Sequence, residues 1–156
     1  DPHPYALNQY HNNLSLLKKI STNTIFIQSA ATGNKECFKK RYFKYDMGMA
    51  SRLVNSSKPS AKPVSTICVS KYIDPTKNHL IKIHIEGTEW EVLKEIFPYI
   101  SRERKTMLLI NCSHNSQGMI QIPLFLLQKG WDVRFNQHSF HGEGLTLYAS
   151  NAKLSN

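Results

Sequence analysis

The 156-residue sequence is poor in the features that mark membrane-spanning and disulfide-rich proteins. Its longest apolar run is far shorter than the roughly 20 residues that a membrane-spanning helix needs, so we expect no segment of this chain to cross a bilayer. No signal-peptide or transit-peptide pattern opens the chain. Cysteine is scarce as well, with 3 residues that lie far apart and form no C-x-x-C pair: Cys37, Cys68 and Cys112. We therefore expect buried, reduced thiols, and neither a disulfide framework nor a zinc site.

Acidic residues are also few, because 11 Asp and Glu stand against 20 Lys and Arg, for a formal net charge of +9. This balance favours acidic partners such as nucleotide phosphates, nucleic acid or anionic surfaces. However, the basic residues lie in separate segments, at 18–19, 39–41 and 102–105. Since a nucleic-acid surface needs such residues clustered on one element, we do not expect this chain to bind nucleic acid.

Strand-like and helix-like segments alternate along the chain, and there are no internal repeats. This alternation predicts an α/β fold with a mainly parallel sheet, in one domain over residues 1–150 with a tail at 151–156. In such folds ligands bind outside the carboxyl ends of the strands. The expected helices are 5–20, 88–100 and 119–130; the expected strands are 24–31, 64–73 (ending in a helical turn), 80–86 and 105–113, with a closing antiparallel pair at 131–137 and 145–150. Residues 33–45 read as strand or irregular, and 55–63 as a loop.

Polar residues interrupt the otherwise apolar strand in the stretch "LIKIHIEG" at 80–87. Lys82, His84 and Glu86 are two apart and share one side of the strand, while three isoleucines share the other. One explanation is an ion pair between Lys82 and Glu86 on a partly exposed edge, with His84 as a spectator. The other is a site, since Glu86 and Gly87 fall at the carboxyl end of the strand, where a ligand crevice is expected.

The residues after Gly87 carry the signals of a helix start. Thr88 and Glu91 have the T-x-x-E spacing of a capping box, in which the two side chains bond the first backbone N–H groups of a helix. The N–H groups and dipole of such a helix start favour an anionic or polar ligand nearby. Large apolar residues at helical spacing predict the buried stripe: Trp90, Leu93, Ile96, Phe97 and Ile100.

Four segments of the chain, in order, resemble the FkbM-type methyltransferases, which use S-adenosylmethionine (SAM). The stretch "IKIHIEGTEWEVL" is similar to the family's Lys-Ile-Asp-x-Glu-Gly-x-Glu motif, and "DPHPYALNQYHNNL" is similar to its acidic-Pro-x-Pro segment and following helix. Between them, "IFIQSAATGN" resembles a strand ending in a turn of small residues, and "MGMASRL" resembles the loop before the next strand. The order and spacing agree up to about Ala149.

The resemblance implies a Rossmann-like, doubly wound class I methyltransferase fold and methylation of a hydroxyl group on a sugar or another small molecule. Carried over by position, the cofactor-binding residues are Asp1, Ser29, Ala30, Glu86 and Gly87. In this assignment Asp1 binds the ribose hydroxyls of SAM, which suits a carboxylate that accepts two hydrogen bonds. The small residues lie near the adenine, and Glu86 and Gly87 lie beside the methyl group.

The resemblance also implies a catalytic set of His84, Glu86 and Glu89, in which His84 or Glu86 is the general base. Methyl transfer from a sulfonium depends mainly on in-line placement, and a base adds a smaller factor of about 10²–10⁴. Among the other histidines, His138 and His141 form an H-x-x-H pair that His114 could join. No carboxylate or thiol pattern completes it, so we expect no metal site.

The chain departs from the family pattern at several positions. The family's opening strand and Gly-rich loop would precede Asp1, and the chain has no initiator methionine, so we expect a fragment, a processed form or an incomplete gene model. The family's aspartate is His84 here, Ser70-Lys71 stands where acidic residues are frequent, and Asn111 stands where a glutamate is common. These changes leave a second hypothesis open, a methyltransferase-like domain that no longer catalyses and acts as a basic binding or scaffolding module.

Overall fold

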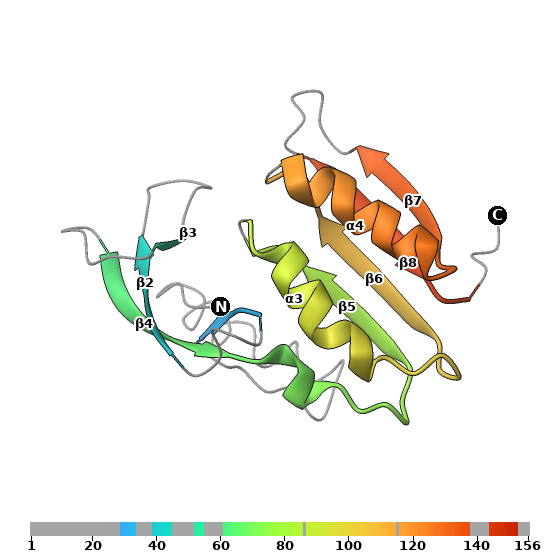
Figure 1. Ribbon diagram of the computed structural model, residues 1–156, viewed down its shortest axis with the longest axis horizontal. Helices are drawn as coiled ribbons and strands as arrows, with labels where there is room; N and C mark the ends of the chain where they lie inside the picture. Colours follow the sequence, from blue (N-terminus) through green and yellow to red (C-terminus); the bar gives the residue numbers. More distant parts are fainter. Residues whose placement is uncertain are drawn as a thin grey trace, which may run out of the picture. The chain divides into compact units, whose positions relative to one another are not determined.

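The structure, a computed structural model, describes residues 29–33, 39–44, 52–54, 61–85, 87–114, 116–137 and 144–152, with the side chains of Arg52 and Gln117 left out. The chain separates into two compact units, Asp1–Ala31 with Glu36–Ile67, and Thr32–Lys35 with Cys68–Asn156. Figure 1 labels their elements. The predicted helix over 5–20 and most of the predicted strand over 24–31 lie outside the described residues. A single domain over 1–150 stays a prediction.

The first unit holds a four-stranded sheet with the order β1-β4-β2-β3. Its strands are β1 (Ala30–Ala31), β2 (Lys40–Lys44), β3 (Arg52–Val54) and β4 (Ala61–Ile67). The pair β1 and β4 is parallel, and the other two pairs are antiparallel. Two expectations fail here, because residues 52–54 form a strand where we expected only a loop, and the expected loop over 55–63 gives way to strand from Ala61. Pairing with β2 overrides the local loop composition in both places.

The second unit holds the other four-stranded sheet, with the order β5-β6-β8-β7. The strands and helices predicted between residues 80 and 150 are found in this unit, including the antiparallel closing pair. The elements are η2 (Val69–Tyr72) and η3 (Phe97–Tyr99), which are 3₁₀ helices; α3 (Glu89–Ile96) and α4 (Ser116–Gln128); and β5 (His79–Ile83), β6 (Thr106–Asn111), β7 (Asp132–Gln137) and β8 (Leu145–Ser150).

The α/β class is confirmed, but the described residues do not form a mainly parallel sheet. Of their six strand pairings, only β1 with β4 and β5 with β6 are parallel. In the second unit β8 returns between β6 and β7 and runs antiparallel to both. The connection from Gln137 to Leu145 is short, and a short connection can join only antiparallel neighbours.

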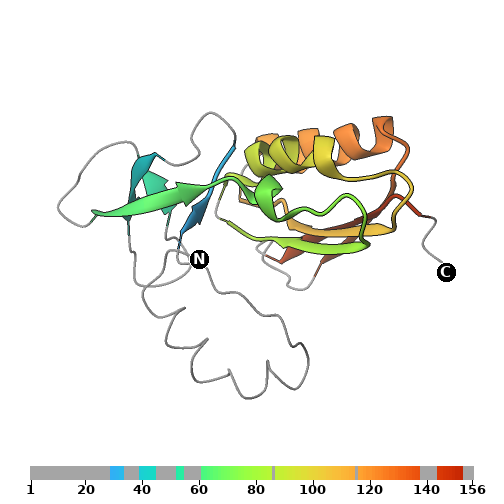
Figure 2. The same ribbon diagram turned by 90° about the horizontal axis from the view of Figure 1, so that it is seen from below.

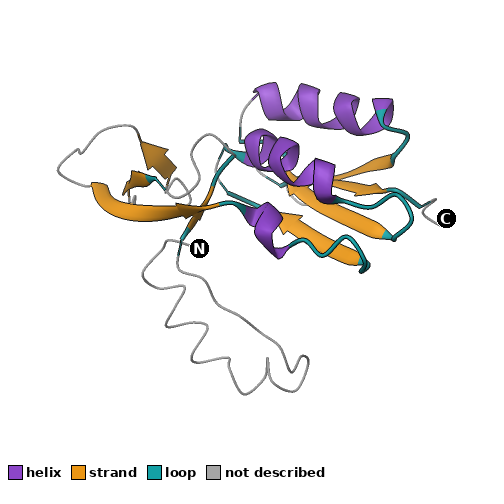
Figure 3. Ribbon diagram, turned by 60° about the horizontal axis from the view of Figure 1, so that its bottom comes forward, coloured by secondary structure: helices purple, strands orange, loops and turns teal. Residues whose placement is uncertain are grey.

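Both α-helices of the second unit lie on the same face of its sheet, as Figures 2 and 3 show. The side chains on the helix-covered face alternate along each strand with those on the opposite face. The core of this unit is the helix-covered face, where four strand residues are fully buried: Leu108, Ile110, Leu147 and Ala149. On the opposite face Leu80 is 72% exposed and Lys82 is exposed. Met107, Leu109 and Tyr148, which the register places on that same face, are half-buried.

Helix α3 is fixed by apolar packing and by one buried carboxylate. Leu93 and Ile96 are fully buried, as predicted, whereas Trp90, Phe97 and Ile100 are only half-buried. Phe125 of α4 meets the rings of Trp90 and Phe97 edge-on, with centroids 5.3 and 4.7 Å away. The pattern did not predict that Glu95 is 2% exposed. Its carboxylate accepts hydrogen bonds from the Ser70 N–H of η2 at 3.1 and 3.2 Å, which offsets the cost of burying it.

Three further sequence-based expectations can be compared with the structure. Helix α4 ends just before Gly130, whose φ of 79° suits a glycine at a helix end, as predicted. The expectation of reduced thiols is wrong for Cys68, which is disulfide-bonded, while Cys112 is a buried free thiol. Cysteine spacing in a sequence does not show which thiols the fold brings together. Among the residues that the structure describes, no helix combines the length and the apolar character needed to cross a membrane.

Candidate functional site

The loop that follows β5 is held by the side chain of Glu89, the first residue of α3. Its carboxylate accepts hydrogen bonds from the Ile85 N–H at 3.1 Å and the Gly87 N–H at 3.0 Å. Gly87 has a φ of 99°, which favours glycine, so the chain can turn sharply here. The predicted capping box is not formed, because the Thr88 side chain makes no cap and its hydroxyl donates to the Ile85 carbonyl at 3.3 Å. Glu89 therefore organises the strand-to-helix turn.

The same carboxylate also binds an imidazole from the neighbouring strand end. His114 lies in the turn after β6, and its Nδ1 is 2.6 Å from Glu89 Oε1, with side chains 16% and 3% exposed. Burial raises the pKa of Glu89, but hydrogen bonds from His114 and from the backbone N–H groups of Glu89 and Ile85 outweigh it, so this pKa lies below its usual value. An ionised carboxylate can only accept, so His114 Nδ1 carries a hydrogen.

Asn111, at the end of β6, determines the state of the other imidazole nitrogens. Its Oδ1 accepts from the Ser113 N–H at 3.1 Å and the Ser113 hydroxyl at 2.7 Å. Because a backbone N–H can only donate, the amide cannot be flipped, and Nδ2 faces His84 Nε2 at 3.2 Å and His114 Nε2 at 3.4 Å. An amide N–H₂ donates, so both Nε2 atoms act as acceptors in these contacts.

These four residues, His84, Glu89, Asn111 and His114, form what we call the strand-end cluster. The parallel register pairs Ile83 with Ile110, which places His84 beside Asn111 at the carboxyl edge of the sheet. The rings of His84 and His114 stack with centroids 5.1 Å apart and an interplanar angle of 28°. The cluster thus joins two neighbouring strand ends and a helix start, which is where α/β folds bind their ligands.

The predicted site residues fall into three groups. His84, Gly87 and Glu89 meet in the second unit, around the strand-end cluster. Ser29 and Ala30 lie in the first unit, where Ala30 is buried in β1. Asp1 and Glu86 lie outside the described residues, so their roles stay predictions.

Sequence reasoning considered His114 as a metal ligand or as a base beside Cys112, and Asn111 only as a departure from the family pattern. The signal that could have pointed to both is the rule that searched the end of β5, applied to the end of β6, but the parallel pairing of the two strands is known only from the structure. Within the described ranges, no group of three or more His, Cys, Asp or Glu is arranged to hold a metal ion. His138 and His141, the other members of the considered metal set, lie outside those ranges.

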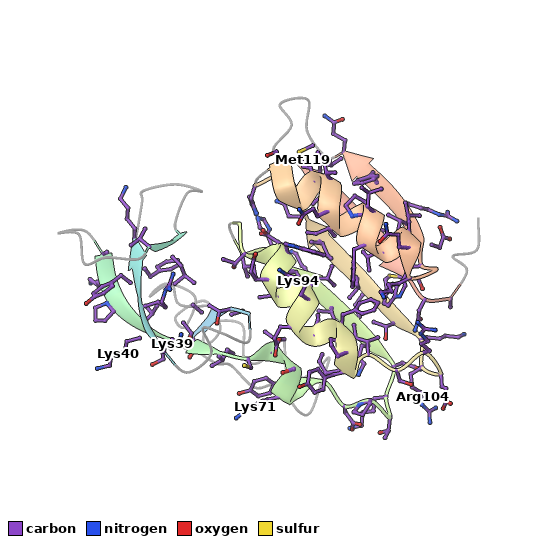
Figure 4. The ribbon with its side chains drawn as sticks, in the orientation of Figure 1. Lys39, Lys40, Lys71, Lys94, Arg104 and Met119 are labelled. Atoms are coloured by element: carbon purple, nitrogen blue, oxygen red, sulfur yellow. The ribbon has the colours of Figure 1, made fainter. Side chains whose placement is uncertain are left out.

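Basic residues of the second unit lie on separate elements. Figure 4 shows Lys71 on η2, Lys94 on α3 and Arg104 in the turn before β6. Lys94 is engaged locally, with its Nζ 4.0 Å from Glu91 Oε1 and 5.0 Å from the centre of the Trp90 ring. That this chain does not bind nucleic acid stays a prediction.

No protein-family model matches this chain, and no curated protein matches it. A solved structure, that of methyltransferase FkbM from Methylobacillus flagellatus, matches with a TM-score of 0.67 at 19% sequence identity. The match covers 96% of this chain and 35% of that protein. The chain has an FkbM-like methyltransferase fold. This FkbM-like fold is the one that the sequence motifs implied, and the chain spans about a third of the length of the protein that it matches.

Proposed function

We propose that this chain is part of a SAM-dependent methyltransferase that methylates a hydroxyl group on a sugar or another small molecule. The observation that carries the proposal is the FkbM-like fold over 96% of the chain. The order of the FkbM-like motifs and the polar cluster at two parallel strand ends support it independently. A doubly wound, Rossmann-like arrangement of the complete sheet belongs to this proposal, as do the SAM-binding roles of Asp1, Ser29, Ala30, Glu86 and Gly87.

The residues of the second unit suit one part of such a cofactor site. Gly87, with its positive φ and no side chain, lets the backbone of the β5–α3 turn pass close to a ligand. Glu89 does not suit the role of a ribose ligand, because its two oxygens already accept hydrogen bonds from Ile85, Gly87 and His114. When bound, SAM supplies a methyl group on a good leaving group, so the protein has mainly to place the acceptor in line and remove one proton.

The strand-end cluster has the chemistry for that proton. Imidazole is the side chain whose proton affinity suits acid–base work near neutral pH, and two imidazoles lie here with their Nε2 atoms as acceptors. His84 and Glu89, two of the three residues predicted as catalytic, belong to the cluster. The contacts of Glu89 assign it a positioning role, because it holds the β5–α3 turn and the His114 ring.

The proposal is tested by calorimetric titration of the protein with SAM and with its demethylated product, S-adenosylhomocysteine. ATP is the matched control, because it shares the adenosine group and lacks the methionine part. We expect both adenosylated amino acids to bind and ATP not to bind, and we expect label from methyl-labelled SAM to appear in a panel of sugars and hydroxylated small molecules. Absence of binding by either compound would contradict the proposal and favour the non-catalytic binding module.

A further inference from the structure

We propose that His114 is the catalytic base of this site and that Glu89 is its positioning residue. The inference rests on the proposed function and extends it, because it assigns the proton-accepting atom to a residue outside the family motif. That atom is His114 Nε2, on the side of the ring away from Glu89, where the acceptor hydroxyl would replace the 3.4 Å contact from Asn111 Nδ2. Four observations carry it: the 2.6 Å contact to a buried carboxylate, the acceptor role of Nε2, the strand-end position and the neighbouring imidazole.

The contact to Glu89 prepares the His114 ring for a proton. Nδ1 donates to the carboxylate of a side chain that is 3% exposed, which fixes the ring plane and leaves Nε2 as the nitrogen that can take a proton. The positive charge gained at Nε2 would be spread over the ring and would face that carboxylate at hydrogen-bond distance. A charge pair in a partly buried setting is screened far less than one in water, so Glu89 favours the protonated ring.

The transfer step balances with these groups alone and the two reactants. The acceptor oxygen forms a bond to the methyl carbon while the bond from that carbon to sulfur breaks, and its electron pair stays on sulfur. The hydroxyl proton goes to His114 Nε2, and the ring becomes an imidazolium that releases the proton to solvent before the next turnover. The reaction therefore yields a methyl ether, the thioether product and one proton.

Several observations favour His114 over His84 as the base. The Nε2 atoms of both rings face the amide of Asn111, but His84 is exposed, whereas His114 is half-buried and its Nδ1 faces a carboxylate. The two ring centroids are 5.1 Å apart, so two protonated rings would repel each other and only one proton is favoured in the pair. Among the described residues, the titratable groups around His114 are Glu89 from α3, His84 after β5 and the buried thiol of Cys112 at the end of β6. We infer that His84 serves, with Asn111, to orient the site.

The test is a set of pH–rate profiles of the full chain with SAM and an acceptor identified in the labelling experiment. His114→Asn keeps a donor towards Glu89 but removes the basic nitrogen, and we expect kcat to fall by about 10²–10⁴-fold, with loss of the acid limb of the profile. SAM affinity should stay within about threefold, because the base contacts the acceptor and not the cofactor. His79→Asn is the matched control: the His79 Nε2 lies 2.7 Å from the Asp74 carbonyl at the opposite end of β5, so its profile should match the wild type.

A second readout does not depend on turnover. Nitrogen-15 imidazole spectra of the wild type should show His114 in the Nδ1–H form, and Glu89→Gln should shift it towards a mixture of tautomers while His79 is unchanged. Should His114→Asn fail to fold, His114→Gln and the Glu89→Gln profile carry the test. A wild type without methyl transfer would refute the proposed function together with this inference. A wild type that transfers methyl groups, while folded His114 variants keep its kcat and its acid limb, would overturn this inference alone.

Discussion

The two faces of the sheet in the second unit differ in what covers them and in what they carry. The face under α3 and α4 (Figure 3) carries the fully buried strand residues, among them Leu108 and Ile110. The opposite face is formed by the alternate residues of each strand. It carries Lys82 and half-buried residues such as Leu109. Lys82 is therefore tolerated in β5 because it lies on the less covered face, where a charged group keeps its water.

The candidate site is built where that second face ends. His84 continues the row of Lys82, and Asn111 continues the row of Leu109, so both lie at the carboxyl edge of the less covered face. Glu89 and His114 come from the turns beyond the two strands and close the network. One face of the sheet therefore stabilises the unit through buried packing, and the carboxyl edge of the other face carries the candidate site.

The largest expected effect contrasts two neighbouring leucines of β6. Leu108→Ala should lower the free energy of unfolding by about 2–5 kcal/mol, because it leaves a cavity in fully buried packing. Leu109→Ala should cost less than half as much, since that side chain is half-exposed. Urea unfolding of both variants measures the difference. Equal losses would mean that the opposite face is as well covered as the first.

The helices and strands of the second unit could be predicted from the sequence because their signals are local. Alternating polar and apolar residues indicated β5, a short apolar run indicated β6, and Gly130 indicated the end of α4. The buried state of Glu95 could not be predicted, because its partner is the Ser70 N–H, which lies 25 residues earlier in the chain. The pairing of β8 with β6 likewise could not be predicted, because it joins strands that are far apart in the chain.

The candidate site could be predicted only in part, for the same reason. His84, Gly87 and Glu89 stand in one motif, so their proximity follows from the sequence. His114 contacts Glu89, which lies 25 residues earlier in the chain, and Asn111 contacts His84, which lies 27 residues earlier. Both contacts depend on the parallel register of β5 and β6, which a single sequence does not specify.

A smaller change in the free energy of unfolding is expected at Glu89, the first residue of α3. Because the pKa of Glu89 is lowered in the folded state, its contribution is fully present above the pKa of the unfolded carboxyl, about 4.3. That contribution is lost as the pH falls through the lower folded pKa. Glu89→Gln should cost about 1–3 kcal/mol at neutral pH and flatten the loss of stability in acid.

Urea unfolding between about pH 3 and pH 7 measures this dependence. The control is Glu91→Gln, two residues along the same helix, where the carboxylate is half-exposed and lies 4.0 Å from Lys94. That variant should change stability by less than about 1 kcal/mol. An equal acid dependence in the wild type and in Glu89→Gln would show that the hydrogen bonds to this carboxylate do not stabilise the fold.

The smallest effect is expected at Lys82, in the middle of the less covered face. Lys82→Thr keeps a residue suited to a strand and removes a charge that lies in solvent, so the free energy of unfolding should change by less than about 0.5 kcal/mol. Its neighbour Ile83 is 3% exposed under the helices, and Ile83→Thr should cost several times more, because it buries a hydroxyl in apolar packing. Thermal unfolding of the two variants compares the faces within one strand. A large loss in Lys82→Thr would show that the lysine is bound to a partner on that face, and the explanation of β5 by exposure alone would be wrong.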